Sequence, residues 1–214
     1  MRILLTIFLL SGSGFVISSC RTVYKNLDPV AGHSIEELDQ FRPAFGVGLY
    51  KASVDVTGRH LSGLVVIKKM PDSSIRIAFT SETGPTFFDF SWPAQGDFKV
   101  QSIIPQLNKK AIIKTLRKDF ELVLMNRLVQ GGFEVAEKDE NRWYIFERPK
   151  GFDAYVTNKQ LTSLMWMERS SKKKTIVEAE TLLDKNGIPD SVIITHQQFV
   201  FRIELTKIKR NAEE

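Results

Sequence analysis

The fold is decided by residues 74–92, SIRIAFTSETGPTFFDFSW, in which two strand patterns flank a turn. In the first half, apolar and polar side chains alternate, and one face carries Ile75, Ile77 and Phe79. This period of two is typical of a β-strand with one buried face. Gly84 and Pro85 interrupt the alternation and indicate a turn, after which the aromatic run TFFDFSW indicates a second strand. The stretch therefore predicts an antiparallel hairpin rich in aromatic side chains.

Strand patterns continue on both sides of this hairpin. Together with it, two preceding runs and one following run predict a five-stranded meander over residues 45–56, 61–70, 74–81, 86–92 and 97–103. The C-terminal part predicts six more strands, over residues 142–148, 154–159, 161–169, 175–184, 191–196 and 199–208. Short turn signals separate most of these runs, which is typical of a long antiparallel sheet.

One helix is expected between the two groups of strands. Asn108 is a suitable N-cap residue, and the helix is predicted to run to about Leu128. Four apolar residues repeat at four-residue steps and are expected to face the open side of the sheet: Ile112, Leu116, Phe120 and Leu124. The opposite face is largely basic and carries Lys110, Lys114, Lys118 and Glu121.

The N-terminus has the features of a bacterial lipoprotein signal. A basic start is followed by a short apolar run that is too short for a comfortable membrane span. Ile17-Ser18-Ser19-Cys20 resembles a lipobox, in which the Cys thiol receives a diacylglyceryl group. Cys20 is the only cysteine, which favours this interpretation over a buried structural thiol. We expect lipidation at Cys20.

These signals divide the chain into three parts. Residues 1–19 are predicted to be a signal peptide, residues 20–40 a lipidated tether, and residues 41–211 the folded domain. Within the tether, Ser34 and Glu37 have the spacing of a capping box at the start of a short helical stretch.

Composition excludes several classes of function. The chain of 214 residues is 43% hydrophobic and 26% charged, which is ordinary for a globular protein. Its net charge of +5 is scattered rather than gathered in a basic stripe, so no nucleic-acid partner is expected. The three His residues form no ligand-spaced motif, and no nucleophile or phosphate-loop motif is present. We therefore expect no catalytic residue, metal or cofactor, and no enzyme activity.

Two features leave alternatives open. Asp89 stands between two Phe residues, where burial would raise its pKa, or it points away from them on the other strand face. The 15 Phe residues suit the lining of an apolar cavity under the helix, but residue types alone favour a packed core. The residues concerned are Phe79, Phe88, Phe90, Phe98 and Phe120.

The order of these segments resembles a known family. The lipobox, the meander with GPTFFDFSW (84–92), the helix and the closing GIPDSVIITHQQFVFRIELTKIKRN (187–211) look like the LolA/LolB family of outer-membrane lipoprotein carriers and receptors, especially its divergent members in Bacteroidetes-type bacteria. The resemblance implies a mainly β (α+β) fold, an incomplete antiparallel β-barrel of about 9–11 strands with a covering helix. It also implies an apolar cavity for acyl chains, here with Phe79, Phe88, Phe90, Phe98, Ile112, Leu116, Phe120 and Leu124 as candidate lining residues.

The receptor branch of the family also carries an apolar loop after its third strand. Gly84, Pro85, Phe87 and Phe88 fall at that place, so a membrane-contacting loop is expected there. The chain departs from the family in showing only one strong covering helix and a short loop.

The resemblance implies three partners: the membrane through the lipid anchor, the acyl chains of lipoproteins or other lipids, and a periplasmic carrier protein. No Asp follows Cys20, and no acidic run follows it either, so we expect the protein on the periplasmic side of the outer membrane. The alternative function is an envelope scaffold or interaction lipoprotein with a packed interior and no cargo. A cavity of at least roughly a few hundred Å³ would separate the two functions.

Overall fold

A computed structural model of the chain describes residues 23–56, 58–129 and 132–209. The expected signal peptide and Cys20 lie outside these residues. No helix among the described residues is long and apolar enough to cross a membrane.

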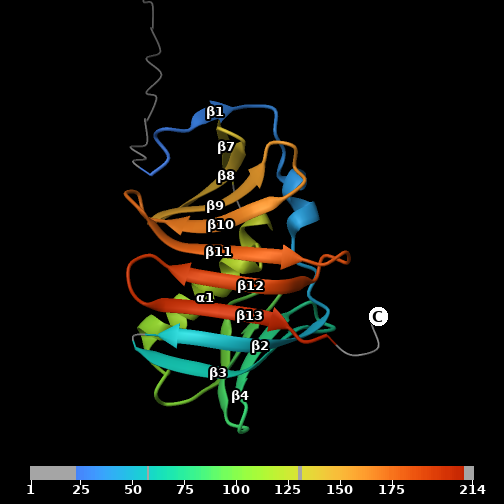
Figure 1. The fold of residues 1–214 in the computed structure, drawn as a ribbon, viewed down its shortest axis with the longest axis vertical. Coiled ribbons are helices and arrows are strands. Elements are labelled where there is room, and N and C mark those ends of the chain that lie inside the picture. Colours follow the sequence, from blue (N-terminus) through green and yellow to red (C-terminus); the bar gives the residue numbers. More distant parts are fainter. Residues whose placement is uncertain (1–22, 57, 130–131, 210–214) are drawn as a thin grey trace, which may run out of the picture.

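The described chain forms one curved antiparallel sheet (Figure 1). The order of its thirteen strands is β1-β7-β8-β9-β10-β11-β12-β13-β2-β3-β4-β5-β6. The strands are β1 (Asp28–Val30), β2 (Val47–Val56), β3 (Arg59–Lys69), β4 (Ile75–Ser81), β5 (Thr86–Trp92), β6 (Lys99–Ile103), β7 (Phe133–Lys138), β8 (Asn141–Arg148), β9 (Gly151–Asn158), β10 (Leu164–Ser170), β11 (Thr175–Leu183), β12 (Pro189–His196) and β13 (Phe201–Lys207). The helices are the 3₁₀ helices η1 (Ile35–Phe41) and η2 (Asn126–Val129) and the α-helix α1 (Lys110–Val123).

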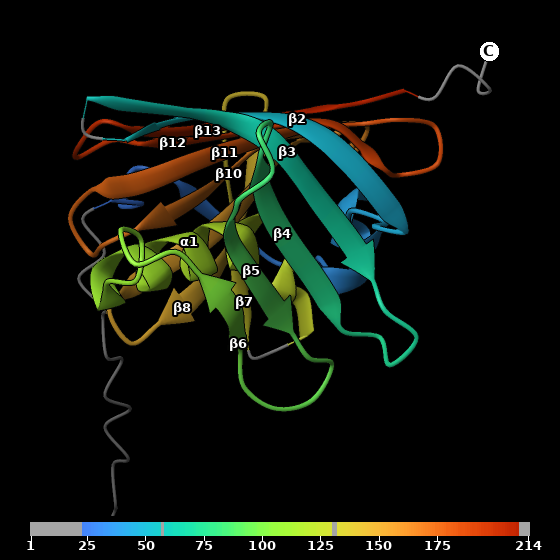
Figure 2. The same ribbon diagram turned by 90° about the horizontal axis from the view of Figure 1, so that it is seen from below.

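Two meanders, β2–β6 and β7–β13, are joined into this sheet by the pairing of β13 with β2. The sheet curves around α1, which lies on its concave side (Figure 2). The ends of the strand order, β1 and β6, do not pair with each other, so the barrel is open. The predicted mainly β fold, an incomplete antiparallel barrel with a covering helix, is confirmed.

The number of strands is higher than the predicted 9–11. The additional strands are β1 and β7, which pair with each other at one edge of the sheet and which the sequence pattern does not predict. β1 has only three residues, and β7, FEVAEK, has three charged side chains among six residues. Neither segment has an apolar pattern strong enough to identify it. β1 pairs with the distant β7, and β7 also forms a hairpin with β8.

The part of the expected tether that the structure describes is integrated into the fold. β1 pairs with β7, and η1 places the fully buried Leu38 in the core. The expected capping box does not form, because Ser34 makes no side-chain hydrogen bond as the N-cap of η1. Glu37 instead accepts a hydrogen bond from the Tyr144 hydroxyl.

The helix is shorter than predicted. α1 begins after Lys109 rather than Asn108, because residues 104–108 form consecutive turns in which the Asn108 N–H donates to the Ile104 carbonyl (3.1 Å). The helix ends at Val123, and Met125 has a positive φ of 52° before η2 begins. Its inner face is as predicted, with Leu116, Phe120 and Leu124 buried.

Candidate functional site

The concave side of the sheet and the inner face of α1 enclose an apolar space. Ile112, Leu116 and Phe120 of α1 line it on one side. The sheet contributes only apolar side chains: Val54, Val56, Leu61, Val65, Phe79, Phe88, Phe201 and Ile203. Leu107, which precedes α1, also lines the space. Its volume is about 50 Å³, far below the ~300–1,000 Å³ of ligand-binding pockets. The interior in this conformation is therefore packed rather than hollow.

Five of the eight predicted lining residues meet at this space: Phe79, Phe88, Ile112, Leu116 and Phe120. The other three lie beyond it. Phe90 stacks on Phe88 with ring centroids 4.5 Å apart, Leu124 is buried in the core, and Phe98 packs against Trp92 at 5.1 Å. Whether these residues take up an acyl chain stays a prediction.

The predicted membrane loop is a tight hairpin connection. β4 ends at Ser81 and β5 begins at Thr86, and the Ser81 N–H donates to the Pro85 carbonyl at 2.8 Å. Gly84, at the tip, has a φ of 114°, which favours glycine. Gly84 and Pro85 are exposed in this turn.

The two aromatic rings after the turn both pack against the protein. Phe88 is buried, and Phe87 is half-buried with its ring 4.7 Å from that of Phe79. Strict alternation predicts that only one ring faces inward. A register shift next to Phe79 pairs Thr80 with Thr86, so Phe87 is an extra residue in β5, and such a bulge turns its side chain from the regular alternation. Phe88 therefore lies in the interior, and Phe87 lies at the edge of the interior.

Asp89 points away from the aromatic interior. Its carboxylate accepts a hydrogen bond from the Arg76 Nε–H at 2.8 Å, and the two side chains form a surface ion pair. Of the two alternatives, the outward orientation is confirmed. The described residues also contain no group of three His, Cys, Asp or Glu side chains placed to hold a metal ion.

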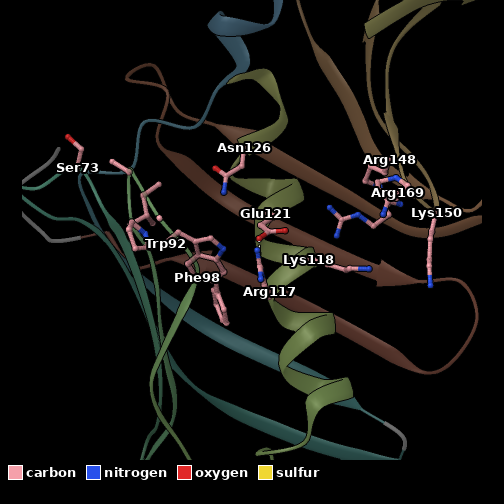
Figure 3. A pocket seen from close by; sticks show the side chains of 15 residues that line it. Ser73, Trp92, Phe98, Arg117, Lys118, Glu121, Asn126, Arg148, Lys150 and Arg169 are labelled. Carbon is pink, nitrogen blue, oxygen red and sulfur yellow. Dashed lines mark hydrogen bonds and ion pairs between the residues drawn. The ribbon is translucent and has the colours of Figure 1, made fainter. Parts of the chain in front are cut away.

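A second and larger hollow lies along the outer face of α1, with a volume of about 700 Å³. Figure 3 shows Trp92 and Phe98 on one side of it, and the side chains of Arg148, Lys150 and Arg169 on the other. Arg117, Lys118 and Glu121 of α1 lie between them. We call this hollow, with its five basic residues Arg117, Lys118, Arg148, Lys150 and Arg169, the cationic cleft.

The cationic cleft is not predicted by any local pattern in the sequence. Its basic residues come from α1, from the end of β8 and the turn after it, and from β10. The sequence pattern shows only the largely basic outer face of α1, which includes Lys118 and Glu121. The cleft appears only when the curved sheet brings the end of β8 beside α1.

Neither the family models nor the curated proteins include a match to this sequence. Solved structures do match. A domain described as an outer membrane lipoprotein-sorting protein domain from Vibrio parahaemolyticus aligns with a TM-score of 0.54 and 9% identity, over 84% of this chain and 93% of that one. The chain has a divergent LolA/LolB-like fold.

A LolA superfamily protein from Nitrosomonas europaea also aligns, with a TM-score of 0.48 and 8% identity over 82% of this chain and 90% of the other. At such low identities the LolA/LolB-like likeness concerns the fold. The cargo and the location must be argued from this chain's own residues.

Proposed function

We propose that this protein is a membrane-anchored, LolA/LolB-like lipoprotein that binds acyl chains under α1 and takes part in localising lipoproteins to the outer membrane. The observation that carries the proposal is the wholly apolar space between α1 and the open barrel. The proposed cargo is the acyl chains of lipoproteins or other lipids, delivered by a periplasmic carrier protein.

Binding requires α1 to move, because the space of about 50 Å³ does not accommodate a long acyl chain. Moving α1 outward would expose Leu116 and Phe120, at a cost of roughly 1.5–3 kcal/mol for each side chain. A buried acyl chain offsets that cost, since each CH₂ contributes about 0.8 kcal/mol. Cargo and helix would therefore compete for the same apolar surface.

Lipidation at Cys20 and placement on the periplasmic side of the outer membrane belong to the same proposal. The lipobox supports the first, and the absence of Asp after Cys20 supports the second. Mass spectrometry of the protein purified from a bacterial host should find a mature chain that begins at an acylated Cys20. A free thiol at Cys20, or fractionation with the inner membrane, would contradict this part.

The small interior volume favours the second candidate, a scaffold or interaction lipoprotein with a packed interior. The two functions differ in whether an acyl chain can enter. A photoactivatable palmitate probe added to the full chain would separate them. In the cargo-binding function, crosslinks fall on residues that line the apolar space; in the scaffold function, none does.

A pair of helix variants gives this experiment a matched control. Ile112 and Ile113 are adjacent, half-buried residues of α1, but only Ile112 lines the apolar space. Ile112→Trp should lower the crosslinking yield several-fold, because the larger ring occupies the space. Ile113→Trp should leave the yield close to that of the wild type. Equal yields from both variants would contradict acyl-chain binding under α1.

A further inference from the structure

The cationic cleft concentrates positive charge in a concave site. Its described lining contains five basic residues and one carboxylate, Glu121, which pairs with Arg117 at 2.6 Å. Behind the lining lies the carboxylate of Asp153, which is fully buried and forms ion pairs with both Arg148 (2.9 Å) and Arg169 (2.7 Å). Asp119, which is hydrogen-bonded to His196, also acts by its charge on Arg169 and Lys118. Five basic residues therefore face three carboxylates, an excess of two positive charges.

Several donors at the cleft lack a partner among the described residues. Lys118 and Lys150 line the cleft and form no ion pair with another described residue. Arg169 is only 5% exposed, yet its Nη1 is a buried donor with no hydrogen-bond acceptor in the described part of the chain. The Nε1 of Trp92, on the opposite wall, is buried and unpartnered in the same way. Because buried donors without acceptors are costly, these two point to an acceptor other than the residues that the structure describes.

The basic groups also repel one another. Burial lowers the pKa of Lys118, and the charges of Arg169 and Arg148 lower it further. Burial opposes the charge of Arg169 as well, but hydrogen bonds and charge from Asp153 outweigh this effect and raise the pKa of Arg169. The Arg169 guanidinium is therefore a permanent charge, and an anion bound beside it and Lys118 would relieve their repulsion.

The side of the cationic cleft formed by Trp92 and Phe98 also reaches the apolar space. The ring of Trp92 lies 5.9 Å from that of Phe120, and Phe120 lines the apolar space on the inner side of α1. Phe98, at 5.1 Å from Trp92, also lies under the guanidinium of Arg117 at 5.2 Å. An amphiphile with a charged head could therefore place its head in the cleft and direct its chain past this wall.

We propose that the cationic cleft binds a phosphate group, either on the headgroup of a lipid or as a free oxyanion. Arg and Lys side chains suit this chemistry because they give charge-assisted hydrogen bonds to several phosphate oxygens. If the proposed acyl-chain function holds, this group is the head of the bound lipid, and the inference then deepens that function. The phosphate site itself does not depend on it.

The test is isothermal titration of the full chain in a neutral detergent with three probes. These are dihexanoyl phosphatidic acid, dihexanoyl phosphatidylcholine and inorganic phosphate. We expect phosphatidic acid to bind more tightly than the zwitterionic phosphatidylcholine. Inorganic phosphate that binds as tightly as phosphatidic acid identifies a free oxyanion as the ligand, and weaker binding identifies a lipid headgroup. The proposal is overturned if neither phosphatidic acid nor inorganic phosphate binds, or if dihexanoyl glycerol, which carries no phosphate, binds as tightly as phosphatidic acid.

A double variant localises the binding. Lys118→Gln with Lys150→Gln removes the two cations that have no carboxylate partner and should weaken phosphatidic acid binding at least tenfold. The matched control is Lys51→Gln with Lys185→Gln, which removes the same charge at exposed positions outside the lining and should change affinity less than twofold. Equal effects of the two double variants would show non-specific attraction and overturn the site.

A neutral acyl probe keeps this inference separate from the proposed function. Dihexanoyl glycerol has the chains but no phosphate, so its binding should be unchanged by the cleft variant. Binding of phosphatidic acid that depends on the cleft, without any binding of the neutral probe, would support the phosphate site and count against acyl-chain binding. Binding of the neutral probe, without cleft-dependent binding of phosphatidic acid, would support acyl-chain binding and count against the phosphate site.

Discussion

At the scale of single residues, Asp153 is the carboxylate on which the buried basic residues depend. It is fully buried and pairs with Arg148 and Arg169. Asp153→Asn would remove the buried carboxylate with which both guanidinium groups pair, and breaking a buried pair in this way costs about 3–5 kcal/mol. Urea denaturation should show this loss. Asp89→Asn is the control, because its partner Arg76 is exposed and such surface pairs contribute only about 0–1 kcal/mol. Similar losses in both variants would contradict the assignment.

A second residue-scale prediction concerns pH. Burial raises the pKa of Glu168, although hydrogen bonds from Tyr24 and Trp166 act in the opposite direction. A raised carboxyl pKa in the folded state gives stability that is complete below the unfolded pKa of about 4.3. That stability is lost as the pH rises through the folded pKa. Glu168→Gln does not titrate, so its free energy of unfolding relative to the wild type should increase between pH 4 and pH 7. A difference that is constant with pH would contradict this.

At the scale of elements, substitutions in α1 test which face of the helix is buried. Phe120→Asp would place a charge among apolar side chains and should cost several kcal/mol. Lys114→Asp, on the exposed face of the same helix, is the control and should change the melting temperature only slightly. An unchanged melting temperature for Phe120→Asp would show that the inner face is misassigned.

The β4–β5 hairpin supports a different element-scale prediction. Phe88→Glu should destabilise the protein strongly because Phe88 is buried, whereas Phe87→Glu should cost much less at a half-buried position. Phe87→Glu is therefore the variant that tests the membrane loop. If the loop takes part in delivery, this variant folds but inserts fewer lipoproteins into membranes. Normal insertion by a folded Phe87→Glu protein would leave the loop as a simple connection.

At the scale of the whole molecule, local sequence patterns predict much of the fold. The alternation in residues 75–81 and the four-residue steps of Ile112, Leu116 and Phe120 predicted the strands and the inner face of α1. What they could not predict depends on distant pairing. β1 and β7 define one edge of the sheet together, the bulge at Phe87 depends on the register with β4, and the cationic cleft gathers residues from 73 to 169.

The central claim is that α1 moves outward from the sheet when acyl chains bind. A distance measurement by electron spin resonance tests it directly, with spin labels at Lys114→Cys on the outer face of α1 and Lys51→Cys on the outer face of β2, both exposed positions. Without cargo the distribution should be single and narrow. With a triacylated lipoprotein present, we predict a longer distance, because the chains take the place of Leu116 and Phe120 against the sheet. An unchanged distribution at saturating cargo would contradict the claim.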